Sequence, residues 1–320
     1  MKNLGFYLFF CLVTITCFVI LANYKRDTLG DDIHFVWLEG QRLLFGENPY
    51  ERILLGNMRE DNYYAIYFPF FYSFSALTQI LGLSEYTKWL VFWRPVSLFF
   101  NLGIAFLIFE ILLRNKKWLA ACFSVLFWLF NRWTLHGTLA AYLDFMPLFF
   151  LMLSLIIFKK YQWPSLLIFS FSLAIKQMGI FLIPLYLIWV GQSSQKNAWF
   201  QIVIAFLVIF SIPIFISLPF VFWNAEAFFK SIMFSTTRLA ATNFGEPSIS
   251  SIIGLTGIPA RIPMFFLLCL IYLAVLRKEI KKYLAVLLTM FTFVYFSPVL
   301  FSQHLCWVVC FIPLTLVDKY

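Results

Sequence analysis

The feature that most constrains this chain is a series of apolar stretches, each close to the length of a membrane-spanning helix. Hydrophobic residues make up 62% of the 320 residues and charged residues only 12%, whereas soluble domains are about half apolar and a quarter charged. A water-soluble fold of this size could not bury so many Phe, Leu and Ile side chains, which excludes an ordinary cytosolic enzyme. Because a span needs roughly 20 apolar residues, we expect ten spans, several of them short: 4–23, 89–113, 118–132, 142–158, 163–176, 178–190, 198–217, 262–276, 283–300 and 303–317.

The predicted fold class is therefore all-α, with a single polytopic membrane domain over residues 1–320. Residues 24–88 form a first external region with juxtamembrane helices, and residues 218–261 form a second. The first apolar run also has the charged start of a signal peptide, but no small-x-small cleavage site follows it. We interpret it as a retained helix.

The basic residues set the predicted orientation, because cytoplasmic loops are enriched in Lys and Arg. Short basic loops lie at residues 114–117, 159–160, 196 and 277–282, and both chain ends carry a lysine. With all of these placed inside, the cytoplasmic face holds twelve basic and three acidic residues, a balance equal to the net charge of +9 of the whole chain. The charge needs no nucleic-acid partner. We expect a multi-pass protein of the plasma or inner membrane with both termini in the cytoplasm.

This orientation places the apolar stretch 63–83 outside. The span before it, 4–23, ends on the external side, and the span after it, 89–113, begins on that side, so the stretch between them does not cross the membrane. The stretch is rich in Tyr and Phe, which favour the lipid–water interface. We interpret it as an interfacial helix along the outer leaflet. The alternative is an ordinary span with a different charge distribution. Before it, Ile33–Phe45 has the spacing of an amphipathic helix, with Asp31 and Asp32 at its N-terminus and Gly46–Pro49 after its end.

Ionisable groups inside apolar stretches are functional candidates by default. Asp144, Lys176, Arg94 and His304 are such groups, and the predicted topology puts all four at the outer side. Lys176 interrupts two very short apolar runs, a pattern typical of a recess that enters the outer leaflet. Each of these four groups also has a purely structural interpretation. Arg94 could reach the interface, Asp144 could cap a helix, Asp144 and Lys176 could pair with each other, and His304 could be a core histidine with satisfied hydrogen bonds.

Four segments, in chain order, resemble a known family of enzymes. Asp32–Tyr50 resembles the D-x-x-x-Y…G-x-x-P-Y signature, Tyr67–Phe70 the Y-x-Y-P-P-L motif, Leu173–Gln177 the L-A-x-x-x-K-P motif and Ser297–His304 the S-P-x-S-W-x-H-H motif. These signatures belong to the GT-C glycosyltransferases, and the most similar branch is the polyprenyl-phosphate-mannose-dependent mannosyltransferases of glycosyltransferase family 87. The chain departs from the motifs at Phe70, Phe301 and Gln303, and Asp144 lies near the place of the Asn in the family's G-Q-x-N.

The resemblance implies a hexosyltransferase. Such an enzyme moves mannose or another hexose from a polyprenyl-phosphate donor to a lipid-linked or glycan acceptor on the non-cytoplasmic side, inverting the anomeric carbon. Asp32 is then the general base. The implied partners are the donor, the acceptor and membrane lipids. A monophosphate leaving group held by cations requires neither a cofactor nor a metal. The donor-phosphate candidates are Lys176, Arg238, Arg261 and His304, and the substrate or supporting candidates are Asp31, Asp144, Tyr67, Gln177 and Gln303.

A membrane transporter or lipid flippase is the alternative interpretation, since it also uses intramembrane charges and broken helices. A transport path should place polar residues through both leaflets. In this sequence the halves of the spans next to the basic loops are uniformly apolar, which favours the enzyme.

Overall fold

The computed structural model describes residues 4–23, 28–29, 31–55, 65–194, 197–237, 248–255, 259–297 and 300–318. In these ranges the chain is all-helical and contains no strand. The helices are α1 (Leu4–Asn23), α2 (Asp32–Leu44), α3 (Arg52–Leu55), α4 (Phe70–Ile80), α5 (Tyr86–Arg114), α6 (Trp118–Phe130), α7 (Arg132–Leu139), α8 (Phe145–Ile157), α9 (Gln162–Ile175), α10 (Ile183–Ser193), α11 (Ala198–Thr237), α12 (Ile249–Ile252), α13 (Ile262–Leu276), α14 (Lys282–Tyr295) and α15 (Ser302–Val309). Short 3-10 turns are η1 (Gln177–Leu182), η2 (Pro259–Arg261) and η3 (Pro313–Val317).

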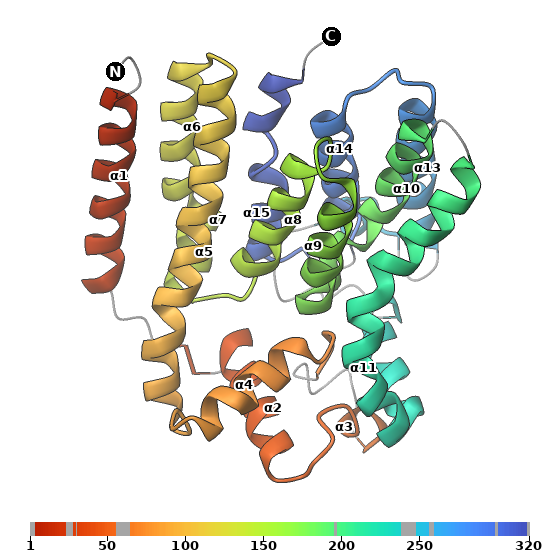
Figure 1. The fold of residues 1–320 in the computed structure, drawn as a ribbon. Coiled ribbons are helices and arrows are strands. Elements are labelled where there is room, and N and C mark those ends of the chain that lie inside the picture. Colours follow the sequence, from red (N-terminus) through yellow and green to blue (C-terminus); the bar gives the residue numbers. More distant parts are fainter. Residues whose placement is uncertain are drawn as a thin grey trace.

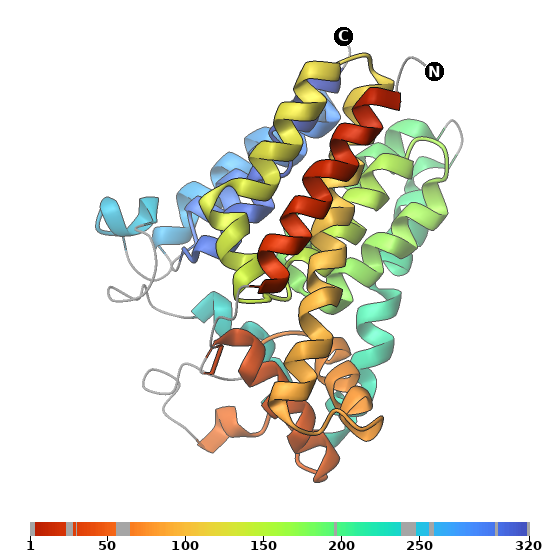
Figure 2. The same ribbon diagram turned by 90° about the vertical axis from the view of Figure 1, so that its left-hand side faces the viewer.

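The helices form a bundle with a cap of short helices at one end. Figures 1 and 2 show α2, α3 and α4 at the end of the bundle away from both chain termini. We call α2, α3, α4 and residues 65–69 the cap. The basic loops between α5 and α6, between α8 and α9, and between α13 and α14 lie at the opposite end of the bundle (Figure 1).

Among the described residues, three helices are long and apolar enough to cross a membrane: α1, α5 and α11. α6 and α7 together reach the required length but are bent by 50°. The bend is at Asn131, which follows the last residue of α6 and is the N-cap of α7. Its side-chain oxygen accepts hydrogen bonds from the backbone N–H groups of Trp133 and Thr134. The remaining apolar helices are shorter, so the expected number of about ten spans is not confirmed.

The break expected at Lys176 is present. α9 ends at Ile175, Lys176 has an extended backbone (φ −154°, ψ 125°) and the 3-10 turn η1 leads into α10. A 3-10 turn rises more steeply than an α-helix and has poorer hydrogen-bond geometry. The chain thus crosses this region as two short helices joined at a lysine.

The structure shows the conformation of two segments that we predicted to be external. Residues 218–237, expected in the second external region, are helical: α11 continues to a kink at Asn224 (φ −159°), and a second helical segment then reaches Thr237. The expected interfacial helix 63–83 is shorter: α4 spans Phe70–Ile80 after Pro69, and residues 63–64 lie outside the described residues. Its 11 residues reach ~16 Å, about half the hydrocarbon thickness. α4 packs on α2 within the cap (Figure 1).

Candidate active site

Asp32 lies at the N-terminus of α2, as the sequence predicted. Asp31 has the extended backbone of an N-cap residue, but its side chain makes no capping hydrogen bond. Asp32 lies in the first turn, near the positive end of the helix dipole, which stabilises an anion. Its Oδ2 accepts a hydrogen bond of 2.8 Å from Nε2 of Gln303 in α15. The first external motif and the C-terminal motif therefore meet, although the two residues are 271 positions apart.

A buried ion pair lies on the neighbouring helices. Nζ of Lys176 donates to both oxygens of Asp144, at 2.8 and 2.9 Å, and the two side chains are only 2% and 3% exposed. The indole Nε1 of Trp307, a fully buried residue of α15, donates to Oδ1 of the same carboxylate at 2.7 Å. Asp144 is thus held by a cation and a neutral donor, the condition under which a buried carboxylate is tolerated.

The segment before α4 covers this ion pair. Nζ of Lys176 lies 4.9 Å from the centre of the Tyr67 ring, a cation–π distance. Nε2 of Gln177 donates to the carbonyl oxygen of Ile66 at 2.6 Å. Two phenols hold the backbone of Tyr67: Tyr50 donates to its carbonyl oxygen, and its N–H donates to the hydroxyl of Tyr72. The predicted residues Tyr67, Gln177 and Lys176 are therefore neighbours.

The other cationic candidates are His304, Arg261 and Arg238. His304 follows Gln303 in α15, is half-buried, and packs edge-on against Phe301 with ring centres 5.4 Å apart. Arg261 is half-buried at the start of α13, which packs against α10 and α14. Arg238 lies outside the described residues.

The geometry changes the role expected of Lys176. The sequence placed it among the ligands of the donor phosphate, with pairing to Asp144 as the alternative, and the structure has the pair. Two of the three N–H donors of the ammonium group point at Asp144, and the Tyr67 ring lies beside it. Only the third N–H donor would be available to a phosphate, on a side chain that is 2% exposed.

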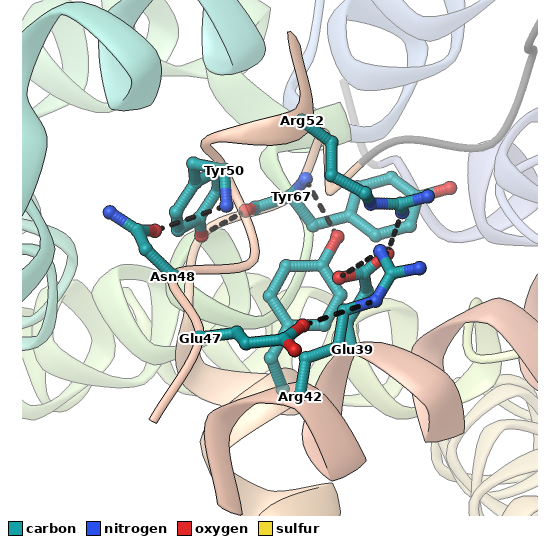
Figure 3. A network of polar contacts seen from close by, with 8 residues as sticks. Glu39, Arg42, Glu47, Asn48, Tyr50, Arg52 and Tyr67 are labelled. Carbon is teal, nitrogen blue, oxygen red and sulfur yellow. Dashed lines mark hydrogen bonds and ion pairs between the residues drawn. The ribbon is translucent and has the colours of Figure 1, made fainter. Parts of the chain in front are cut away.

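A second polar cluster, which the sequence patterns did not predict, lies in the cap (Figure 3). Glu39, 2% exposed, forms ion pairs with Arg42, at 3.2 Å, and with Arg52 of α3. Figure 3 shows both guanidinium groups turned toward this one carboxylate. Burial raises the pKa of Glu39 to about 7, and Arg42 acts against the rise. The available signal was Glu39 itself, beside Val36 and Gly40 on the apolar face of α2.

Trp307 was missed as well. It lies four residues after Gln303 and therefore on the same face of a helix, so the predicted helix 303–317 held the signal. Among the described residues, no group of three or more His, Cys, Asp or Glu side chains is arranged to hold a metal ion.

The site therefore combines one helix-terminal carboxylate, a buried ion pair and a short helix that contacts both. Comparisons with known proteins add no family: no family model, no curated protein and no solved structure matches this chain.

Proposed function

We propose that this chain is an integral-membrane glycosyltransferase that moves a hexose from a polyprenyl-phosphate donor to a lipid-linked or glycan acceptor at the non-cytoplasmic face. In this proposal the cap end of the bundle faces outward and holds the reaction. Mannose is the hexose to test first, because the resembled family uses it.

One observation carries the proposal: the hydrogen bond between Asp32 and Gln303. Each residue belongs to a motif that resembles one of the GT-C signatures, and the motifs stand at opposite ends of the chain. The contact lies where the cap meets the bundle, at the end opposite the basic loops. A carboxylate joined to the C-terminal motif in this way supports a reaction site rather than a surface acid.

The proposed chemistry is a single displacement. A hydroxyl group is a poor nucleophile, so it needs a base positioned within hydrogen-bond reach. Asp32 takes the proton of the acceptor hydroxyl group while the oxygen of that hydroxyl group attacks the anomeric carbon. The bond between that carbon and the phosphate oxygen breaks with its electrons going to the phosphate, and the anomeric configuration inverts.

The departing polyprenyl phosphate gains negative charge, which nearby cations stabilise electrostatically. His304 is the first candidate, because it follows Gln303 in α15. Arg261 and Arg238 are the other two. Lys176 enters the proposal as a support instead, since Asp144 already neutralises it.

The experiment uses the purified full-length chain in detergent or nanodiscs, a radiolabelled polyprenyl-phosphate mannose or glucose, and a panel of lipid and glycan acceptors. We expect the wild type to transfer the sugar. Asp32→Asn should lower the rate of transfer by at least about 10²-fold, which is within the range that a positioned base contributes. Asparagine keeps the size of the side chain and its ability to accept a hydrogen bond from Gln303.

Glu85→Gln is the matched control, since Glu85 is an exposed carboxylate, 57% accessible, next to the start of α5. It should leave the rate unchanged. Thermal unfolding of each variant separates loss of the base from loss of the fold. Full turnover by a folded Asp32→Asn variant contradicts the assignment of the base, and no transfer by the wild type from either donor contradicts the proposed function.

A further inference from the structure

The carboxylate of Asp32 is held by a neutral amide. Nε2 of Gln303 donates to Oδ2 at 2.8 Å, and Gln303 is only 5% exposed. An amide donor fixes the orientation of a carboxylate without adding a charge beside it. Since an ionised carboxylate has about four acceptor positions, Oδ1 and the second lone pair of Oδ2 keep their capacity to accept a proton.

The position of Gln303 depends on the next turn of α15. Trp307 lies on the same helix face, four residues later, and its Nε1 donates to Oδ1 of Asp144 at 2.7 Å. Asp144 is in turn fixed by the two hydrogen bonds from Lys176. Helix α15 therefore connects two sets of hydrogen bonds: Trp307 joins it to the buried ion pair, and Gln303, one turn earlier, joins it to Asp32.

The hydrogen bonds of α15 reach beyond the buried ion pair. Trp307 is fully buried and the ion pair is nearly so, but Gln303 extends these contacts to a half-buried carboxylate at the start of a cap helix. Buried groups of α15 and the ion pair therefore support Asp32, the one acid that we assign to the reaction.

We propose that Gln303 and Trp307 are positioning residues, which transmit the fixed geometry of the Asp144–Lys176 pair to the carboxylate of Asp32. The inference rests on the proposed function in one respect, that Asp32 is the reacting base. Neither residue contacts the sugar in this proposal. Their effect should therefore appear in the chemical step and not in binding of the donor.

The test uses Gln303→Leu, which removes the amide donor, and Trp307→Phe, which keeps an aromatic ring but removes the indole N–H. A displacement of about 1 Å at a reacting group costs about 10²-fold in rate. We expect kcat to fall by roughly 10- to 100-fold in each variant, with the KM for the donor unchanged within about twofold. In an Asp32→Asn background, neither change should lower the residual rate further, as expected for coupled residues.

Matched controls are available in the same chain. Trp128→Phe removes the indole donor of another fully buried tryptophan, which bonds the carbonyl of Asn101 at 3.3 Å. Gln192→Leu removes an amide that bonds the carbonyl of Val275 at 3.0 Å in α13. Both controls should keep the wild-type kcat. A rise in donor KM with unchanged kcat in Gln303→Leu or Trp307→Phe overturns the inference, because those residues would then bind the donor directly.

A second readout does not depend on activity. The N–H groups of His34 and Phe35 donate to the carbonyl of Asp31 at 2.9 and 3.3 Å and report on the first turn of α2. Hydrogen exchange of these amides should become faster in Gln303→Leu and Trp307→Phe and stay unchanged in the controls. If the wild type transfers no sugar, the proposed function fails while this measurement still decides the positioning. Unchanged exchange in both variants overturns it.

Discussion

Glu39 is a carboxylate enclosed between two arginines, each of which remains partly exposed. The Glu39 side chain is 2% exposed, whereas Arg42 is 28% and Arg52 is 34% exposed. Desolvation disfavours the charged carboxylate, and the guanidinium groups favour it. Burial is the larger effect and raises the pKa of Glu39 to about 7. The cap therefore contains an acid that changes its charge near neutral pH.

The sign of the resulting pH dependence follows from linkage. The pKa of Glu39 is higher in the folded chain, about 7, than its ordinary value of 4.5, so the folded state binds the proton more tightly. The stabilisation is complete below about pH 4.5 and is lost as the pH rises through about 7, by at most ~3 kcal/mol. We expect Glu39→Gln, which resembles the protonated acid, to match the wild type at pH 5 and exceed it at pH 8.

Thermal unfolding of both proteins in detergent, at several values from pH 5 to pH 8, measures this difference. Glu47→Gln is the control, since Glu47 is 64% exposed and lies only at the edge of the same cluster, 4.0 Å from Arg42. A difference between wild type and Glu39→Gln that stays constant from pH 5 to pH 8 would show that the two arginines keep Glu39 ionised throughout.

At the scale of elements, the cap depends on the close approach of α2 and α4. Gly40 faces α4 so tightly that an added Cβ would lie 2.5 Å from Oγ of Ser75 and 2.8 Å from the backbone nitrogen of Ala76. One of these atoms is backbone and cannot turn away. The amide of Gln79 adds a hydrogen bond of 2.9 Å to the carbonyl of Trp37 across the same contact.

We therefore expect Gly40→Ala to destabilise the chain by about 1–3 kcal/mol, the usual cost of overpacking, even though alanine favours helices more than glycine does. The control is Gly5→Ala in α1, where an added Cβ meets no atom within 4 Å. Unfolding midpoints in detergent compare the two variants. Equal midpoints for Gly40→Ala and the wild type would mean that α2 and α4 separate more easily than their packing indicates.

Sequence patterns predicted elements where local spacing determines the outcome. The amphipathic helix expected at Ile33–Phe45 is α2, within a residue at each end, and Lys176 interrupts the helices as expected. The span expected to end at residue 217 continues as helix through Pro219 to a kink at Asn224. Proline inside a helix usually breaks it in water, but helices in membranes tolerate it because neighbouring groups satisfy the freed backbone.

The candidate site was predictable only in part, for a related reason. Residue types and their motifs predicted Asp32, Gln303, Asp144 and Lys176 as members of one site. Which side chains pair is decided by tertiary packing, and only the structure places Trp307 on Asp144 and Tyr67 beside Lys176. The pairing changes Lys176 from a proposed phosphate ligand into the partner of a buried acid.

At the scale of the whole molecule, the two ends of the bundle differ in charge and structure. The basic loops 114–117, 159–160 and 277–282 lie together at one end and the cap lies at the other (Figure 1). α5 connects them, with 29 residues and a length of ~44 Å. Because this exceeds the ~30 Å of hydrocarbon in a bilayer, α5 is long enough to cross a membrane and still reach the cap, which it joins through the hydrogen bond between Trp89 and Thr78.

The orientation can be tested with one cysteine at each end of that helix. Lys88 and Arg114 are 68% and 77% exposed, and a positive-inside arrangement puts Lys88 outside and Arg114 in the cytoplasm. In cells that express a variant without native cysteines, we expect a membrane-impermeant maleimide to label Lys88→Cys directly. Arg114→Cys should react only after permeabilisation. The reverse pattern would place the cap and Asp32 in the cytoplasm, where nucleotide sugars are available, and would remove the physical reason for a lipid-linked donor.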